Sequence, residues 1–452
     1  MTILLKNLWG RFQFQDKGVV PTKRLLLIYL AFSLLAIVSS AWNISWTLII
    51  GLNVTLLFLS LLDLFVSPKK NQLSFKRTIP HEMERGIKYN VQLEVGNSSS
   101  QSIEYRLIDG LHQSFKRPFP LHGHAPKETT SVITYETLAP VRGNYEIYKL
   151  FFRYRSHFGL WEKQVTVFLE DTVKVIPDLT ETKHYLESAQ RYLMYEGLTI
   201  RKQKSGVGEF SKVRTYVEGD DPRKINWRQT AKLQTVMTND YEPEHGKYLT
   251  VLLDCGRMMG AELVKGNRLE RAIEAAITVT AAALQKGEYV SVLAFSNKIK
   301  VYVPPAKGMA HLQTILHSIY DLEVDANESN YSAVLQYIQT VQKKRSLLLL
   351  FSDVRTFLHE ESALAYLKRL RQRHLFLMIG VEDHTLISRI NEAPIDVQKV
   401  MVKTIAQQQM LFKKREKSKW EKQGLQMVEA REEKLATAAV SYYIDIMNRG
   451  LL

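Results

Sequence analysis

Two aspartates stand where an acidic side chain could take part in metal chemistry, each directly after an apolar strand. Asp254 ends the run "TVLLD", and Asp353 ends the run "LLLLFSD". The carboxyl ends of neighbouring parallel strands meet at one edge of an open sheet, which is where such sheets bind ligands. Carboxylate oxygens are the ligands that hard divalent cations prefer. The pattern therefore points to a Mg²⁺ site at that edge.

This arrangement resembles the von Willebrand factor type A fold, whose metal site uses an Asp-x-Ser-x-Ser motif, a later threonine and a further aspartate. Gly256 and Met258 stand at the two serine positions and supply no hydroxyl. Ser329 or Asn330 stands at the threonine position, and Asp353 at that of the last acid. The resemblance thus implies a degenerate Mg²⁺ site made of Asp254, Ser329 and Asp353. The alternative is that these acids cap the following helices or bind loop amides.

The elements that must position these acids lie in residues 248–452. Continuous apolar strands alternate there with amphipathic helices, which predicts a parallel sheet covered by helices on both faces, a Rossmann-like α/β domain. A long basic helical insertion is expected near residues 398–422. The single cysteine, Cys255, excludes an intrachain disulfide and fits a reducing compartment. No histidine partner is placed beside it, so a small packing residue is expected there.

Residues 71–178 form a different kind of unit. Short alternating runs such as "YNVQLEVGN" and "NYEIYKLFFRYR" are separated by polar, glycine or proline breaks, which predicts an all-β sandwich. No spacing in this stretch is typical of a catalytic site. A structural role is therefore expected for this unit.

The N-terminal part predicts a membrane anchor. Residues 1–24 form a basic tail, and residues 25–62 contain no charged side chain. That run is too long for one membrane span, so residues 25–66 are expected to form two transmembrane helices with a turn near Asn43 and with Trp42 and Trp46 at interface depth. Basic residues flank both spans, which places both ends in the cytoplasm. The expected protein is a multi-pass inner-membrane protein with cytoplasmic soluble domains.

Residues 179–247 connect the two soluble parts. A helix is expected from Thr180, followed by a basic stretch that ends in "VEGDDPRKINWRQTAK" at residues 217–232. Asp221 and Pro222 suit the N-cap and first position of a helix. Ile225 and Trp227 are expected to dock that helix. Residues 206–208 are expected to form a flexible turn, because the context of a phosphate-binding loop is missing.

The stretch 208–232 also resembles the signature of the domain of unknown function 58 (DUF58) family, and the resemblance extends over nearly the whole chain. "LAPVRGNYEI" and "SHFGLWEKQV" resemble two further segments of that family. The positions that match the signature, and that are expected to serve interaction, are Gly208, Glu209, Phe210, Arg214, Tyr216, Gly219, Asp220, Asp221, Arg223, Ile225, Trp227, Thr230 and Ala231.

The resemblance implies a multidomain architecture of transmembrane hairpin, β-sandwich and von Willebrand A-like domain. It also implies work beside a MoxR-type AAA+ ATPase in assembling or maturing a client protein. We therefore expect a non-enzymatic adaptor that contacts membrane lipid, a MoxR-type ATPase and an unknown client. The alternative is a divalent-metal-dependent hydrolase or transferase that uses Asp254 and Asp353. The formal net charge of +15 alone would suggest a nucleic-acid partner, but no recognised binding module is present, so none is expected.

Overall fold

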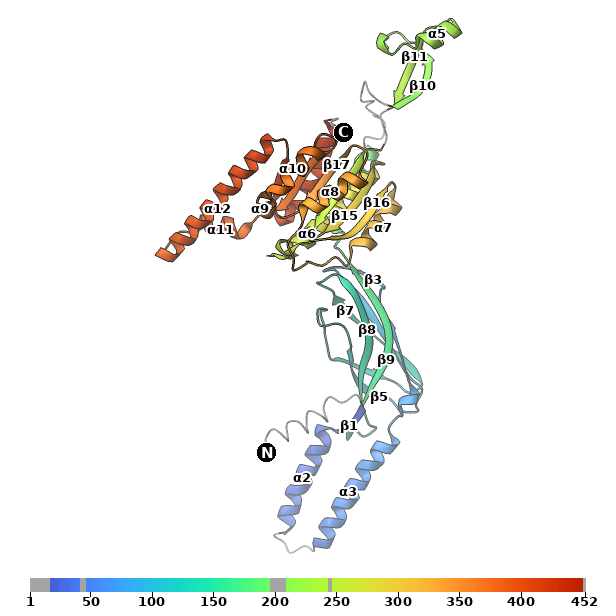
Figure 1. Ribbon diagram of the computed structural model, residues 1–452. Coiled ribbons are helices and arrows are strands. Elements are labelled where there is room, and N and C mark those ends of the chain that lie inside the picture. Colours follow the sequence, from blue (N-terminus) through green and yellow to red (C-terminus); the bar gives the residue numbers. More distant parts are fainter. Residues whose placement is uncertain (1–16, 41–45, 196–208, 243–245, 450–452) are drawn as a thin grey trace. The chain divides into compact units, whose positions relative to one another are not determined.

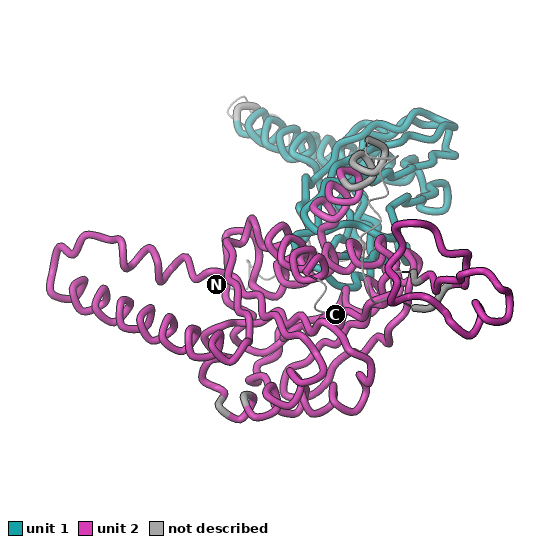
Figure 2. Tube along the Cα trace, turned by 90° about the horizontal axis from the view of Figure 1, so that it is seen from above, with its two compact units in different colours: residues 1–176 teal, residues 177–452 magenta. Residues whose placement is uncertain are grey.

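The computed structural model describes residues 17–40, 46–195, 209–242 and 246–449. The chain divides into two compact units, residues 1–176 and residues 177–452 (Figure 2). The expected glycine turn at 206–208, the signature position Gly208 and the expected membrane turn around Asn43 lie outside the described residues. Each unit is described separately below.

Unit 1 combines two apolar helices with a sandwich of two sheets. The helices are α2 (Lys23–Ser40) and α3 (Trp46–Val66). The strands are β1 (Lys17–Pro21), β2 (Leu73–Thr78), β3 (Glu82–Glu84), β4 (Lys88–Asn97), β5 (Ile103–Asp109), β6 (Leu121–Ala125), β7 (Thr129–Leu138), β8 (Gly143–Arg155) and β9 (Trp161–Ile176). One sheet has the order β1-β9-β8-β5-β6, with β3 beside β9, and the other has the order β2-β4-β7. The expected sandwich is therefore present.

One helical stretch, Trp46–Gln72, is long and apolar enough to cross a membrane among the residues that the structure describes. It contains α3 and the short 3₁₀ turn that follows it. The basic tail differs from the expectation, because residues 17–21 form β1 and pair antiparallel with β9 over Lys17↔Val165 to Pro21↔Trp161. The paired residues are 140 to 148 positions apart in sequence, and such long-range contacts leave no local pattern.

A loop at residues 156–161 binds both apolar helices to the sandwich. Asp63, only 1% exposed near the end of α3, accepts hydrogen bonds from the Ser156 hydroxyl and from the backbone N–H groups of Phe158 (2.9 Å) and Leu160 (3.2 Å). Thr22, just before α2, donates its hydroxyl to the Gly159 carbonyl at 2.6 Å. The "SHFGLWEKQV" segment therefore has a structural role at the helix–sandwich junction.

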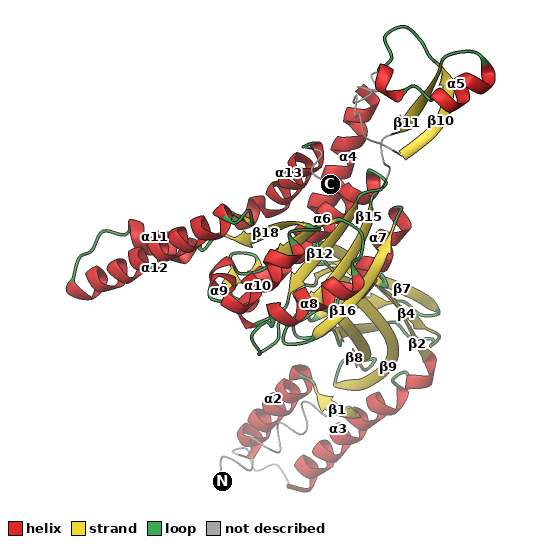
Figure 3. Cartoon of the chain, turned by 45° about the horizontal axis from the view of Figure 1, so that its top comes forward, coloured by secondary structure: helices red, strands yellow, loops and turns green. Residues whose placement is uncertain are grey.

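Unit 2 contains a sheet of order β16-β15-β12-β17-β18-β19, in which β16 alone is antiparallel to its neighbour (Figures 1 and 3). Its strands are β12 (Tyr248–Asp254), β15 (Tyr289–Phe295), β16 (Ile299–Ala306), β17 (Ser346–Phe351), β18 (Leu375–Val381) and β19 (Gln426–Ala430). Two short strands, β13 (Glu262–Leu263) and β14 (Gly266–Asn267), form a separate ribbon. The observed sheet has the doubly covered, mainly parallel form that strand–helix alternation predicts.

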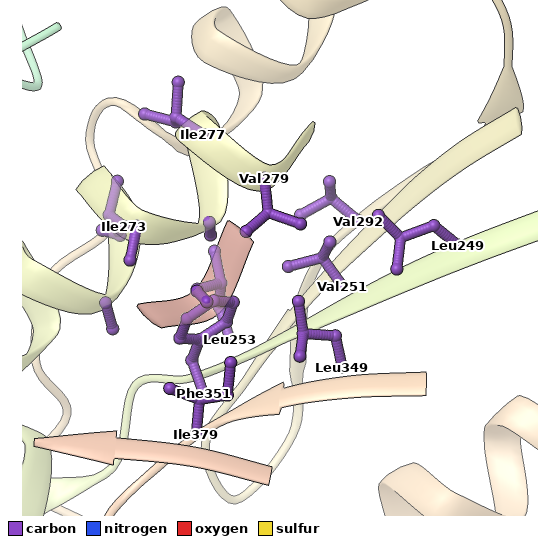
Figure 4. Close-up of a cluster of buried hydrophobic side chains, with 14 of the residues drawn as sticks. Leu249, Val251, Leu253, Ile273, Ile277, Val279, Val292, Leu349, Phe351 and Ile379 are labelled. Carbon is purple, nitrogen blue, oxygen red and sulfur yellow. The ribbon is translucent and has the colours of Figure 1, made fainter. Parts of the chain in front are cut away.

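Helices cover both faces of this sheet. The helices of this unit outside residues 209–242 are α4 (Thr180–Tyr195), which packs on α6, α6 (Arg268–Gln285), α7 (Met309–Ile319), α8 (Tyr331–Val341), α9 (Val354–Leu358), α10 (Glu361–Leu370), α11 (His384–Asn391), which packs on α12, α12 (Val397–Lys422) and α13 (Leu435–Asn448). Alternate strand residues face opposite sides. Leu249, Val251 and Leu253 pack with α6, α7 and α13 (Figure 4). Leu252 packs in the opposite core with α8, α9, α10 and Trp420 of α12.

Residues 209–242 form a small module, flanked on both sides by residues outside the described ranges. It consists of the antiparallel strands β10 (Glu209–Thr215) and β11 (Met237–Glu242), a 3₁₀ turn at Pro222–Lys224 and the short helix α5 (Trp227–Leu233). We call residues 209–242 the signature module.

Candidate functional site

The two strand-end aspartates lie at the carboxyl ends of the adjacent parallel strands β12 and β17, as the strand pattern predicts. Asp254 is 2% exposed and Asp353 is 6% exposed. Ser329 contacts Asp254 through its hydroxyl, so of the two candidates at the threonine position it is Ser329 that reaches the acid. Asn330 instead caps α8 by accepting the Ala333 N–H at 3.0 Å.

Four donors occupy the carboxylate of Asp254. Oδ1 accepts the Ser329 hydroxyl and the Gly256 N–H (2.8 Å), while Oδ2 accepts the Ser352 hydroxyl and the Tyr331 hydroxyl (2.8 Å). Burial raises the pKa of Asp254 above its ordinary value, and the four hydrogen bonds oppose that shift. The carboxylate is thus the centre of a buried hydrogen-bonded cluster.

Gly256 is required for that cluster by close approach. A Cβ atom at position 256 would lie 2.1 Å from Ser329 Oγ and 3.2 Å from Asp254 Oδ1. The backbone there has φ −72°, which any residue adopts. A metal-binding motif would have a serine at position 256. Here the hydroxyl of Ser329 occupies the space that such a side chain would need.

Asp353 is held by different partners. Its Oδ1 accepts a hydrogen bond from Arg268 Nη1 at 2.6 Å, and its Oδ2 accepts both the N–H (3.1 Å) and the hydroxyl (2.7 Å) of Thr356, which caps α9. The helix-capping alternative is confirmed for Asp353, and the loop-amide alternative is confirmed for Asp254 through Gly256. Cys255 is fully buried, as expected of a packing residue.

This donor set does not fit a divalent cation. An ion needs free carboxylate oxygens, whereas those of Asp254 already accept hydroxyl and amide protons and Asp353 faces the guanidinium of Arg268. Within the ranges that the structure describes, no group of three or more His, Cys, Asp or Glu side chains is placed to hold a metal ion. We therefore interpret the strand-end acids as structural.

The signature module is built around Asp220. Arg214 donates two hydrogen bonds to its carboxylate, each at 2.7 Å, and the Tyr216 hydroxyl donates to its backbone carbonyl at 3.1 Å. The pKa of Asp220 is lowered, first by the Arg214 hydrogen bonds and then by the Val217 N–H. Gly219 has φ +106°, a conformation that favours glycine, and it makes the turn that directs Asp220 back toward Arg214.

Further signature residues fix the second half of the module. Asp221 accepts the Arg223 N–H at 3.0 Å and caps the 3₁₀ turn, as its sequence context predicts. The helix does not continue from there, because Asn226 starts a new one, α5, by accepting the Gln229 N–H at 3.1 Å. Thr230 accepts the Met237 N–H at 3.0 Å and fastens α5 to β11.

Several residues of α5 and its surroundings are exposed to solvent. Trp227 is 69% exposed, so the expectation that it docks the helix is wrong in this structure. Ala231, one turn on and on the same side, is exposed too, as are Arg228, Lys232 and the neighbouring Arg223. Ile225, the other expected anchor, is half-buried and pairs through its backbone with Thr238. Glu209 and Phe210 begin β10.

Three further apolar side chains of the module are exposed. Val217 is 60% exposed, Leu233 53% and Val236 43%. A unit this small has little capacity to bury its own apolar surface, and a tryptophan beside arginine is a composition typical of interface centres. We call Val217, Trp227, Arg228, Lys232, Leu233 and Val236 the signature face. Sequence patterns could not separate it from the internal residues, because both sets occur in one motif.

The class of protein is thus a multidomain chain with an apolar helix, a β-sandwich and an α/β unit, carrying a small module with an exposed tryptophan. Residues 212–399 match the family described as "Protein of unknown function DUF58", whose signature residues 208–232 resemble. The expected family is therefore confirmed.

The similar proteins say little about the function of this chain. The uncharacterized protein YeaD of Bacillus subtilis (strain 168) is 24% identical over 195 residues, which cover 43% of this chain and 46% of YeaD. The chain thus matches about half the length of that relative. The conserved hypothetical protein BatB from Bacteroides thetaiotaomicron is similar at 15% identity with a TM-score of 0.31, over 45% of this chain and all of that structure. PapD-like domain 7 of human CEP192 is similar at 13% identity with a TM-score of 0.18, over 24% of this chain and 88% of that structure.

Proposed function

We propose that this chain is a membrane-anchored, non-enzymatic adaptor that binds a partner protein through the signature face. The observation that carries the proposal is Trp227, which is 69% exposed in a module in which Arg214 and Asp220, by contrast, bind each other. The sequence resemblance adds the partner: a MoxR-type AAA+ ATPase acting on a client protein. The exposed Arg228 and Lys232 call for an acidic surface on that partner.

Anchoring by two antiparallel membrane helices is part of the proposal. Thr22 precedes α2 and Asp63 lies near the end of α3, and both bind the loop at residues 156–161. Their common binding site supports a hairpin whose two outer ends lie on one side of the membrane. Lys23, Arg24 and Lys69 flank these ends, which supports a cytoplasmic, inner-membrane orientation for both units.

A von Willebrand A-like character of unit 2 is also part of the proposal. The doubly covered parallel sheet and the adjacent strand-end acids support it. The alternative of a metal-dependent hydrolase or transferase is disfavoured by the bonded state of Asp254 and Asp353. Calorimetry with Mg²⁺ tests that alternative, since stoichiometric binding that is lost in Asp254→Ala would restore it.

Co-purification from native membranes tests the adaptor role. The amount of AAA+ ATPase that co-purifies with the full chain should fall about tenfold or more in Trp227→Ala. This is the effect expected when an interface loses one buried aromatic side chain. Phe168→Ala is a matched control, because Phe168 is an equally exposed aromatic residue on unit 1. Equal recovery of the ATPase by all three proteins would contradict the proposal.

One competing outcome is distinguishable. If Trp227 docks on another part of unit 2, outside the signature module, Trp227→Ala lowers the thermal stability of the purified chain in the absence of any partner. If the signature face binds another protein, the stability of the purified chain stays unchanged and only the co-purification falls.

A further inference from the structure

Helices α11 and α12 pack side by side and project from the α/β sheet (Figures 1 and 3). We call residues 384–422 the arm. α12 is the basic helix that the sequence indicates, and neither the candidate site nor the adaptor proposal uses it. It starts at Val397, with Asp396 as its cap, and extends for about 39 Å at 1.5 Å per residue. Trp420, which is 2% exposed, and an ion pair between Lys413 and Glu429 fix it to the unit. One side of α12 therefore faces inward.

The inward side of α12 is marked by buried residues that are seven positions apart, namely Ala406, Lys413 and Trp420. Two lysines near the start of the helix lie beside this side and are half-buried. Lys399 pairs with the Glu392 carboxylate at 2.9 Å, and Lys403 donates to the Glu392 backbone carbonyl at 3.2 Å. These two lysines therefore hold the end of α11 against α12 and do not contribute to the opposite surface.

The side of α12 opposite to the inward side is exposed along the whole helix. At 3.6 residues per turn, it consists of Val397, Val400, Met401, Thr404, Gln408, Leu411, Arg415, Ser418, Lys419 and Lys422. We call these residues the outer side of α12. Each of them is exposed, so nothing in the part of the chain that the structure describes covers this side.

The outer side combines apolar and basic side chains and carries no carboxylate. Its first half is apolar, with Val397 73% exposed and Leu411 65% exposed. Its second half is basic. Arg415 and Lys419 follow Val397 and Met401 by 18 residues, which is five full turns, so each basic residue lies in line with an apolar one along the helix axis.

Acidic residues around α12 lie off the outer side and have partners within the arm. Asp396 caps the helix by accepting the Lys399 N–H at 2.6 Å. The ion pairs are Glu392–Lys399 (2.9 Å), Glu416–Lys419 (3.3 Å) and Glu421–Lys417 (3.9 Å). Pairs three or four residues apart on a helix surface are weak, so Lys419 can exchange Glu416 for another anion at little cost.

An anionic lipid surface is the partner that this pattern fits. An interfacial helix inserts apolar side chains about 5–10 Å into the boundary between headgroups and acyl chains, while lysine and arginine contact the anionic headgroups. Two copies facing each other by this side would either bring like charges together or set basic side chains against apolar ones. The same chain contains the stretch Trp46–Gln72, which is long and apolar enough to cross a membrane. Such an anchor would tether α12 to a bilayer and raise its effective concentration there.

We propose that the outer side of α12 lies on the anionic surface of the membrane in which this chain is anchored. Val397, Met401 and Leu411 insert at the boundary of the acyl chains, and Arg415 and Lys419 bind lipid phosphates. The inference rests on the membrane anchor that forms part of the proposed function, and it uses no residue of the signature face. It assigns to the arm the task of holding unit 2 against the bilayer.

A fluorescent label on the outer side tests this contact in the full chain. Met401→Cys carries an environment-sensitive fluorophore, and the native Cys255 is buried. The chain is placed in nanodiscs of phosphatidylcholine with or without phosphatidylglycerol, with a quencher attached to the lipid acyl chains. Quenching should be at least about twofold stronger in the anionic nanodiscs. The same label at Met309→Cys should show no such difference, because Met309 begins α7 beside β16, at the edge of the sheet opposite to β19.

Variants that remove charge separate lipid binding from other causes. Arg415→Gln with Lys419→Gln should shift the docking equilibrium about thirtyfold toward the undocked helix, because two basic residues near an anionic surface are lost. Lys298→Gln with Lys343→Gln removes the same charge from exposed positions outside the arm and should leave the quenching unchanged.

The inference is overturned if lipid does not quench the label at position 401 although the chain stays in the nanodisc. Quenching that depends neither on lipid charge nor on Arg415 and Lys419 would contradict it as well. Protection of the label from a water-soluble quencher that rises with protein concentration, without quenching by lipid, would assign the outer side to a second copy of the chain. A chain that does not stay in the nanodisc would overturn the anchor itself, and this inference with it, so the two failures are distinguishable.

Discussion

Replacing Gly256 with alanine tests the interpretation of the strand-end acids. The new Cβ would lie 2.1 Å from Ser329 Oγ, so the Ser329 hydroxyl must leave Asp254. Losing a hydrogen bond to a charged group costs about 1.5–3 kcal/mol, and crowding in a packed site adds about 1 kcal/mol or more. We expect unit 2 to lose about 3 kcal/mol of unfolding free energy.

A double-mutant cycle isolates the contact. Ser329→Ala alone should cost about 2 kcal/mol, because Asp254 keeps its other three donors. In that background Gly256→Ala meets nothing closer than the Ser329 backbone nitrogen at 3.1 Å, and it should cost less than about 1 kcal/mol. The two changes should therefore be coupled by about 2 kcal/mol.

The assay must report on unit 2 alone, since a chain of two units does not unfold in a single step. Denaturation of the full chain in detergent, followed by hydrogen exchange in peptides from β12 and β17, meets this need. Additive costs would refute the claim that Gly256 makes room for the Ser329 hydroxyl. Stabilisation by Mg²⁺ that disappears in Asp254→Ala would refute the structural role of the acid.

Three further predictions concern other parts of the chain. Asp63→Asn should cost unit 1 about 2–3 kcal/mol of unfolding free energy, because the 156–161 loop loses a charged hydrogen-bond acceptor. The melting temperature of unit 1 in detergent should fall accordingly. An unchanged melting temperature would contradict the contacts between Asp63 and this loop. Arg77→Leu should destabilise the sandwich by about 3–5 kcal/mol, because it leaves the buried Asp109 without its bidentate partner. The double variant Arg77→Leu with Asp109→Leu should regain part of the lost unfolding free energy, as measured by chemical denaturation. Asp220 should titrate below its ordinary pKa of 3.8. Its stabilisation of the module is therefore present above pH 3.8 and is lost as the pH falls through the lowered pKa. An NMR titration of the carboxyl group should show that the pKa of Asp220 returns toward 3.8 in Arg214→Gln.

Local rules predicted the features that depend on neighbours in sequence. Asp221 caps a helical turn because its side chain reaches the amide of Arg223 two residues on. The basic helix expected near 398–422 is observed as α12, Val397–Lys422. The adjacency of Asp254 and Asp353 follows from the rule that parallel strands align their carboxyl ends.

Features that depend on distant contacts could not be predicted in this way. The pairing of β1 with β9 and the bond from Arg268 to Asp353 join residues far apart in sequence. The exposure of Trp227 was not predicted either: it stands at the first position of α5, which Asn226 caps, and it is 69% exposed. A hydrophobic residue on a helix predicts burial, and we propose that a partner protein supplies that burial for Trp227.

Identifying what lies against Trp227 in native membranes is the most direct test of the adaptor role. A photo-crosslinking amino acid at position 227 of the full chain, activated in native membranes and analysed by mass spectrometry, identifies whatever covers the signature face. We predict crosslinks to another protein, an AAA+ ATPase, and none from the same amino acid at position 168. Crosslinks confined to the α/β part of the same chain, residues 246–449, would contradict the proposal, because the signature face would then be an internal docking surface.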